Sequence, residues 1–179
     1  MKNIYDKYII GISFGFHDSA VALIQNGVVL NAVEEERFTG IKHDNNFPIN
    51  SINWILKNNN ITGKDISAVC YYENPTLKYD RDKKSYWKYF WKNPFNFPKK
   101  KSELTQFDFI FPNAKVFIGN HHLSHLAYSY FTSDFEESAI LSVDGVGEWD
   151  TTVMAYGKDN TIERKGEVIY PHSLGLLYS

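Results

Sequence analysis

Residues 9–33, IIGISFGFHDSAVALIQNGVVLNAV, decide the fold that this sequence predicts. Three apolar runs, at 9–14, 19–25 and 28–33, are each long enough for a strand and contain the β-branched residues that favour strands. The pair Asn26-Gly27 is a strong signal for a two-residue hairpin, because both residues tolerate a positive φ. We therefore expect the chain to open with an antiparallel meander of three strands.

Helices and strands alternate after this meander. Isoleucine and leucine recur at helical spacing over 49–56, and an apolar run at 65–72 predicts the next strand. Alternation of this kind argues for an α/β layer in which some strands pair in parallel.

The second half of the chain repeats this outline. A predicted strand at 138–143 leads into the turn Asp144-Gly145-Val146-Gly147, and residues 151–156 and 163–169 predict a second hairpin. Two hairpin-led halves with glycine-rich turns suggest the actin-like ATPase (ribonuclease H-like) α/β fold. In that fold, nucleotide phosphates lie between the hairpins.

The expected domains follow from this comparison of the halves. We expect residues 1–137 to form a first α/β subdomain and residues 138–179 to begin a second one that is incomplete. Residues 74–111 interrupt the rhythm with lysines interleaved with aromatic residues, a pattern that can bind single-stranded nucleic acid or a membrane surface. A lid over a phosphate-bearing substrate is a further reading. We favour a helical excursion that packs its aromatic rings on the body of the protein and leaves its lysines in water.

The composition is that of an ordinary globular protein, with 43% hydrophobic residues, 22% charged residues and a net charge of -2. This charge gives no pull toward nucleic acid or membranes, and no apolar run approaches the roughly 18 residues of a membrane span. The single cysteine, Cys70, lies in an apolar run and is expected to be buried. We expect a cytoplasmic protein whose partners include neither membranes nor nucleic acid.

The segment His121-His122-Leu123-Ser124-His125 carries the strongest chemical signal. On a helix, His121 and His125 lie on one face, where both imidazoles can reach one ion, while His122 is rotated by about 100° from His121. Asp144, at the end of a predicted strand, can supply an acidic ligand. The alternative is that the histidines cap a helix and satisfy one another, which is the more common explanation of a bare HxxxH pair. The Asp-Gly-x-Gly turn that follows favours a metal site.

Several motifs together resemble the N-terminal part of O-carbamoyltransferases of the NodU/CmcH type, which include enzymes that carbamoylate nodulation factors, cephamycins and aminoglycosides. The motifs run in family order from about residue 8 to the end of the chain: His17-Asp18-Ser19-Ala20, Glu34-Glu35-Glu36-Arg37-Phe38, Lys42-His43, Phe47-Pro48, His121 to His125, Asp144 to Trp149 and Pro171 to Gly175. Several matches in order are far more specific than any one of them.

The resemblance implies a two-step reaction. Carbamoyl phosphate and ATP, with Mg as its counter-ion, give a carbamoyl adenylate, and the carbamoyl group then passes to a hydroxyl of a small-molecule acceptor. His121 and His125 are implied to bind a divalent metal (Fe, Zn or Mn), with Asp144 as a third ligand or a near partner. A further aspartate, the second half of the actin-like domain and a YrdC-like domain are expected beyond Ser179. We therefore expect the chain to be inactive alone, and an apolar face left uncovered would favour a homodimer.

Three residues near the first hairpin are candidates for contact with substrates. His17 lies in a turn at a strand end, and we expect it to be the base on the acceptor side or to orient the carbamoyl group. The alternative is a turn histidine bonded to Asp18. Lys42 and His43 lie in a loop and are expected to bind an anionic substrate, unless that loop is only solvated.

The glycines of the second turn are candidates for nucleotide binding. Gly145 and Gly147 would let the main chain approach a phosphate, as in other glycine-rich anion loops. The same pattern also fits a plain turn.

Two other functions remain open. A Kae1/TsaD-like protein that transfers a threonylcarbamoyl group to tRNA has a similar domain, but it typically carries HxEGH, from which the insert His122-Leu123-Ser124 departs. A non-catalytic metal-binding module would bind metal or a partner without affinity for nucleotide.

Overall fold

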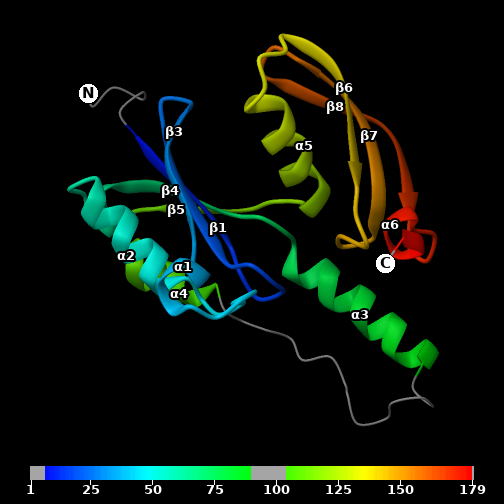
Figure 1. Cartoon of the computed structure of the whole chain (residues 1–179), viewed down its shortest axis with the longest axis horizontal. Coiled ribbons are helices and arrows are strands. Elements are labelled where there is room, and N and C mark those ends of the chain that lie inside the picture. The colour runs from blue at the N-terminus through cyan, green and yellow to red at the C-terminus, as the bar shows by residue number, and fades with distance from the viewer. Residues whose placement is uncertain (1–6, 90–103, 179) are drawn as a thin grey trace. The chain divides into compact units, whose positions relative to one another are not determined.

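The computed structural model describes residues 7–89 and 104–178 (Figure 1). In chain order, the elements are β1 (Tyr8–Ser13), β2 (Ala20–Gln25), β3 (Val28–Glu34), α1 (Glu36–Thr39), α2 (Ile49–Asn58), η2 (Gly63–Asp65), β4 (Ile66–Tyr71), α3 (Pro75–Tyr89), α4 (Thr105–Ile110), β5 (Lys115–Ile118), α5 (His121–Phe131), β6 (Glu137–Val143), β7 (Asp150–Lys158), β8 (Thr161–Ile169) and α6 (Leu174–Tyr178). Contacts divide them into two compact units. The first holds β1 to β4, α4 and β5, and the second holds α3 and α5 to α6.

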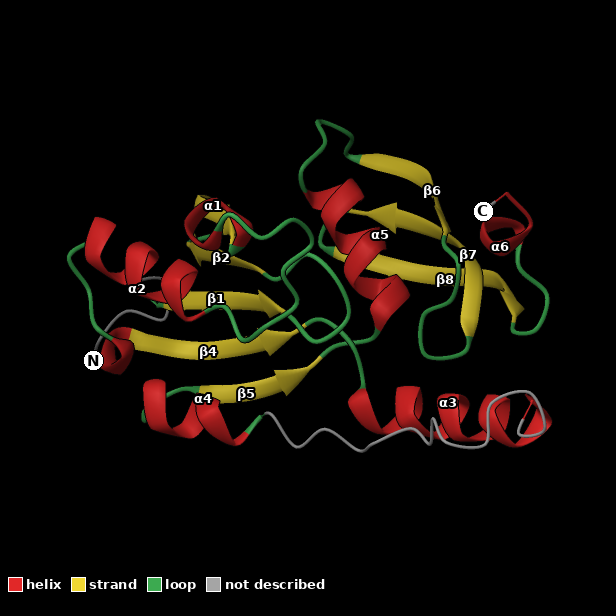
Figure 2. Ribbon diagram, turned by 60° about the horizontal axis from the view of Figure 1, so that its bottom comes forward, coloured by secondary structure: helices red, strands yellow, loops and turns green. Residues whose placement is uncertain are grey.

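The first unit is a five-stranded mixed sheet in the order β3-β2-β1-β4-β5. The expected meander is confirmed, because β1 pairs with β2 and β2 with β3 in antiparallel register. The expected parallel pairing is confirmed as well: β1, β4 and β5 run side by side in the same direction (Figure 2). Asn26 and Gly27 both adopt positive φ, as their hairpin requires.

One buried cluster holds the first unit together. Alternate residues of the central strands, such as Ile10, Leu23 and Val69, point to one face of the sheet and are fully buried. Ile55 of α2 and Phe107 of α4 complete the same cluster. These helices form because their apolar residues recur on one face, and burying that face stabilises them.

Glu35 fixes the start of α2 from a distance in sequence. Its buried carboxylate accepts hydrogen bonds from the main-chain N–H of Asn50 (3.1 Å) and of Ser51 (2.8 Å), and from the hydroxyl of Ser51 (2.6 Å). It thereby satisfies N–H groups that have no partner within the first turn of a helix.

The second unit packs helices on a three-stranded antiparallel sheet in the order β6-β7-β8. The hairpin expected in this half is confirmed as β7 and β8, paired from Lys158–Thr161 outward. Helix α5 contacts β6 and β7, and its Leu126 and Tyr130 pack on Ile140 and Val153. This packing presents the first turn of α5 to the loop that follows β6.

The chain passes between the compact units at Tyr72/Glu73 and at Ile118/Gly119, because α5 packs on β6 and β7. The expected subdomain boundary at residue 137 stays a prediction. The expectation of a buried Cys70 is wrong. Strand residues alternate between faces, so Val69 enters the core and Cys70 points away from it.

The first part of the expected excursion is helical and forms α3, whereas the packing of its aromatic rings stays a prediction. Residues 90–103 of that segment lie outside the described residues. Within the described helices, none is both long and apolar enough to cross a membrane.

Candidate metal centre

The start of α5 is fixed by two side chains that lie outside it. The Asn120 side chain accepts the main-chain N–H of Leu123 at 3.0 Å and so caps the start of the helix. The carboxylate of Glu148 accepts the main-chain N–H of His121, with distances of 3.0 Å and 3.1 Å to its two oxygens. Glu148 also accepts from the main-chain N–H of Asn74 at 2.7 Å, so it joins three segments of the unit.

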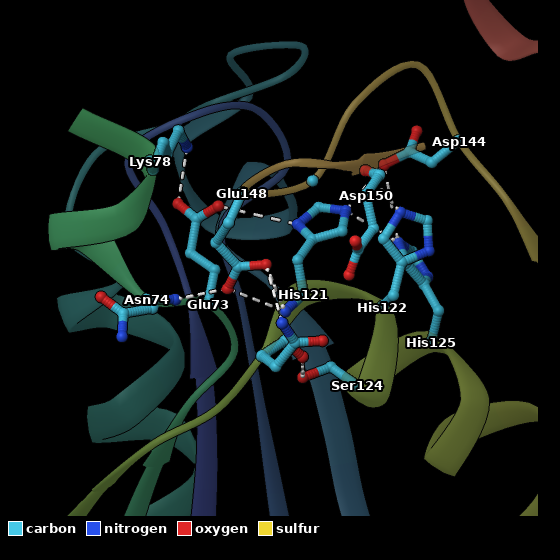
Figure 3. Close-up of polar contacts among 12 residues, drawn as sticks. Glu73, Asn74, Lys78, His121, His122, Ser124, His125, Asp144, Glu148 and Asp150 are labelled. Atoms are coloured by element: carbon cyan, nitrogen blue, oxygen red, sulfur yellow. Dashed lines mark hydrogen bonds and ion pairs between the residues drawn. The ribbon is translucent and has the colours of Figure 1, made fainter. Parts of the chain in front are cut away.

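Two histidines of α5 and the acid after β6 converge at this helix start (Figure 3). The Nε2 atom of His121 lies 2.7 Å from the Oδ2 atom of Asp144 and 3.1 Å from the Nε2 atom of His125. The Nε2 atom of His125 lies 3.9 Å from the same Asp144 oxygen. The structure therefore brings together all three residues expected to bind metal.

Burial and charge shift the proton affinities of this cluster. Burial lowers the pKa of His121, but its hydrogen bonds with Asp144 and Glu73 outweigh burial and raise that pKa to about 9. The hydrogen bond from His121 holds the pKa of Asp144 well below its usual range. Burial and the charge of His121 lower the pKa of His125. Without an ion, His121 and Asp144 form a charged pair with His125 beside it.

A second carboxylate approaches His121 from the opposite side of its ring. The Oε2 atom of Glu73 lies 3.6 Å from the Nδ1 atom of His121, and its other oxygen lies 2.5 Å from the Nζ atom of Lys78 (Figure 3). Glu73 is only 3% exposed, so its charge depends on these partners. The arrangement turns the Nε2 atom of His121 toward Asp144 and His125.

His122 points away from the cluster, as expected. It is fully buried, with Nδ1 2.8 Å from the hydroxyl of Ser142 and Nε2 2.8 Å from the carbonyl oxygen of Asp150. Both ring nitrogens are thus occupied by protein groups. The alternative of histidines that contact one another describes His121 and His125, whose Nε2 atoms lie 3.1 Å apart. It does not describe His122, whose partners are on β6 and β7.

The two glycines expected at the nucleotide have different surroundings. A Cβ atom on Gly147 would lie 3.0 Å from His122 and 3.1 Å from His121, so close packing on α5 explains a glycine there. A Cβ atom on Gly145 would meet only a Leu176 side-chain atom, at 3.5 Å. Their role toward nucleotide stays a prediction.

The candidate substrate residues lie in the first unit. The Nδ1 atom of His17 lies 2.6 Å from Asp18, as the alternative for this residue describes, and the Nδ1 atom of His43 lies 2.8 Å from the other oxygen of the same carboxylate. Lys42 is exposed beside His43. Both histidines are more than half exposed, so their rings are open to a ligand.

Sequence reasoning missed Glu73, Lys78 and Glu148. Glu73 lies two residues after the end of β4. A charged residue just after a buried strand is a signal that could have marked Glu73 as a candidate site residue. Glu148 directly follows the glycine-rich turn Asp144-Gly145-Val146-Gly147. Neither position reveals its contact with His121, because His121 lies 27 or more residues away in the sequence.

Comparison with known proteins gives a family match over nearly the whole chain. The family profile described as "Carbamoyltransferase N-terminus" matches residues 8–179. The Synechocystis sp. protein named "Uncharacterized protein sll1178" is 37% identical, over 96% of this chain and 31% of that protein. "Nodulation protein NolNO" of Sinorhizobium fredii is 32% identical, over 90% of this chain and 24% of that protein. The chain thus spans about a third or less of the length of these curated relatives.

A solved structure also matches. "YeaZ from Pseudomonas aeruginosa" superposes with a TM-score of 0.49 and 12% sequence identity, covering 92% of this chain and 67% of that one.

Proposed function

The chain belongs to the carbamoyltransferase N-terminal family, and on that premise we propose that it carries the metal centre of an O-carbamoyltransferase. The proposed reaction transfers a carbamoyl group from carbamoyl phosphate to a hydroxyl of a small molecule, through a carbamoyl adenylate made with ATP and Mg. The proposed architecture is actin-like, with the remainder of the enzyme outside residues 1–179. Family membership and the relationship to NolNO support carbamoyl transfer in general.

The observation that carries the proposal is the convergence of three donor atoms. The Nε2 atoms of His121 and His125 and an oxygen of Asp144 lie within 4.8 Å of one another. Two imidazoles and one carboxylate form a donor set that suits Fe, Zn or Mn and leaves positions open for other ligands. The residues present therefore fit a divalent metal.

The surrounding residues support the same assignment. A histidine that binds metal usually donates its other ring N–H to a carboxylate, which sets the tautomer and the ring orientation. Glu73 occupies that position for His121, and Lys78 balances its charge. Glu148 holds the helix turn that carries His121. A bound divalent metal would supply Lewis acidity to a phosphate or carbamoyl oxygen.

The remaining roles are proposed from the family motifs and the geometry. His17 accepts the proton of the acceptor hydroxyl, or orients the carbamoyl group. Lys42 and His43 bind an anionic substrate, and Gly145 and Gly147 face the nucleotide. His17, Lys42 and His43 are exposed and are titratable or charged, which is what contact with a small polar ligand requires.

The test is the metal stoichiometry of the purified chain, compared with His125→Ala and with His172→Ala as a matched control. His172 is an exposed histidine of the same unit, so its removal should leave the metal in place. We expect about one metal per chain in the wild type and the control, and none in His125→Ala. Stoichiometric metal in His125→Ala would contradict the assignment.

ATP binding, measured on the same three samples, separates an enzyme part from a binding module. Metal together with ATP binding would place part of the nucleotide site in this chain. Metal without ATP would favour a metal-binding module, or nucleotide contacts that lie in the rest of the enzyme.

A further inference from the structure

Asp18 lies between two histidines that are distant in sequence. Its Oδ2 atom lies 2.6 Å from the Nδ1 atom of His17, and its Oδ1 atom lies 2.8 Å from the Nδ1 atom of His43. An ionised carboxylate only accepts hydrogen bonds, so each Nδ1 atom that contacts it must carry the proton. In the neutral ring, the Nε2 atom is then left as a proton acceptor.

The main chain at these positions is unusual for residues other than glycine. Asp18 has φ of 49° and His43 has φ of 57°, in the left-handed region that Asn and Asp tolerate better than most residues. A conformation of this kind persists when its surroundings hold it. Here it directs the side chains of Asp18 and His43 toward one another.

Other contacts join the two loops without help from the Asp18 carboxylate. The main-chain N–H of Gly15 donates to the Asn45 carbonyl at 2.9 Å, and that of Ser19 donates to the Asp44 carbonyl at 2.7 Å. The side-chain amide of Asn45 also donates to the Phe16 carbonyl at 3.1 Å. The carboxylate is therefore available to act on the two rings rather than to hold the loops together.

The main-chain N–H of His43 does not involve Asp18. It donates to the Glu36 carboxylate at 3.1 Å, so Asp18 contacts only the imidazole of His43. Hydrogen bonds from His43 and His17 lower the pKa of Asp18, which keeps it an ionised acceptor.

From this geometry we infer that Asp18 is a positioning residue that fixes both His17 and His43 in the Nδ1–H tautomer, so that each ring offers Nε2 to a ligand. The inference rests on the proposed role of His17 as the base on the acceptor side. It adds that this base works with an orienting aspartate, and that His43 shares the same aspartate. The proton of an acceptor hydroxyl would pass to Nε2 of His17 while Asp18 stabilises the imidazolium that results, the division of roles known for Asp–His pairs.

The test uses the 179-residue chain with nitrogen-15 in its histidines. Long-range proton–nitrogen spectra distinguish a protonated from a bare ring nitrogen, and therefore one tautomer of the neutral ring from the other. His17→Gln and His43→Asn assign the signals, and asparagine is suited to the positive φ of His43. We expect the Nδ1–H tautomer at both rings in the wild type.

Asp18→Asn is the decisive variant, because asparagine keeps the size and tolerates the left-handed main chain but offers an amide in place of one acceptor oxygen. We expect the ring that faces the amide NH2 group to carry its proton on Nε2, while the ring that faces the remaining oxygen can keep Nδ1–H. At least one ring should therefore lose the Nδ1–H tautomer, with main-chain amide signals unchanged outside the two loops. Glu36→Gln makes the same change of charge at the start of α1. It should leave both tautomers as they are, because the amide oxygen of glutamine can still accept the main-chain N–H of His43.

A wild-type ring with its proton on Nε2, or tautomers that are unchanged in Asp18→Asn, would overturn the inference. The readout needs neither metal nor ATP nor acceptor. Absence of metal in the wild type would thus contradict the proposed function while the tautomer result stands, and a failed tautomer test would leave the metal stoichiometry untouched.

Discussion

The Nε2 atom of His121 lies 2.7 Å from the Oδ2 atom of Asp144, although 23 residues separate the two in sequence. The Nε2 atom of His121 also lies 3.1 Å from the Nε2 atom of His125. Both imidazoles at the start of α5 therefore converge on Asp144 in the loop after β6. This contact links the protonation of the site to metal binding and to stability.

Metal affinity should rise with pH. The pKa of His121 is raised to about 9 by its hydrogen bonds with Asp144 and Glu73, which outweigh burial, and a metal must displace that proton. We expect calorimetric titration with Zn²⁺ at pH 6.5 and 7.5, in two buffers of different ionisation enthalpy, to show weaker binding at the lower pH. It should also show proton release. Equal affinity at both values would contradict His121 as a ligand.

The metal-free chain should lose stability as the pH rises toward 9. His121 has a higher pKa folded than unfolded, so its pairing with Asp144 contributes fully below about pH 6.5 and is lost as the pH passes about 9. The contribution of Asp144 has the opposite sense, because its pKa is lower in the folded chain than in the unfolded one. Its pairing adds stability when the pH is above the ordinary pKa of an aspartate, and that stability is lost in acid. Urea unfolding of the wild type should therefore lose on the order of 1–3 kcal/mol between pH 6.5 and 9.5.

The control for this pH dependence is His121→Gln, which cannot titrate in that range. Its free energy of unfolding should vary less between the same two pH values. An equally steep decline in His121→Gln would assign the dependence to other groups.

Glu73→Gln should weaken metal binding without removing it. The glutamine keeps the shape but loses the charge that lies 3.6 Å from Nδ1 of His121. Loss of such a carboxylate typically lowers metal affinity by about 10- to 100-fold. Competition with a chromophoric chelator measures the affinity, and Asp80→Asn, which neutralises an exposed carboxylate of α3, should leave it unchanged. An unaltered affinity in Glu73→Gln would remove Glu73 from the site.

Gly147→Ala should destabilise the second unit, whereas Gly145→Ala should have little effect. The added methyl at position 147 meets ring and Cβ atoms of His122 and His121 at 3.0 and 3.1 Å, and these are held by α5. Overpacking of this kind costs about 1–3 kcal/mol. At position 145 the nearest contact, at 3.5 Å, is an ordinary one. Urea unfolding of the two variants compares them, and equal stabilities would show that α5 can shift to accept the methyl.

Glu148→Ala should destabilise the chain because the buried carboxylate serves several donors. The main-chain N–H groups of Asn74 and His121 would lose their acceptor, and a buried donor without a partner costs about 1–3 kcal/mol. Glu163→Ala removes an exposed carboxylate of the same unit and should change stability by less than about 0.5 kcal/mol. Similar thermal midpoints for the two variants would contradict the anchoring role of Glu148.

The local patterns of the sequence were read correctly where nearby residues decide the structure. Asn26-Gly27 turns the predicted hairpin, since turn chemistry depends on adjacent main-chain groups. Apolar runs in the sequence located β1 to β4 and β6 to β8. The burial of Cys70 was predicted wrongly, because periodicity within one strand leaves open which face of the sheet is covered.

By itself, the sequence determined that two imidazoles lie one turn apart on a helix, because a helix brings residues i and i+4 to one face. Only the tertiary structure decided what meets them. Packing of α5 on β6 and β7 delivers Asp144 to Nε2, and the buried carboxylates of Glu73 and Glu148 reach the same turn from other elements. These acids are placed by burial and by pairing across long sequence separations, which no local pattern encodes.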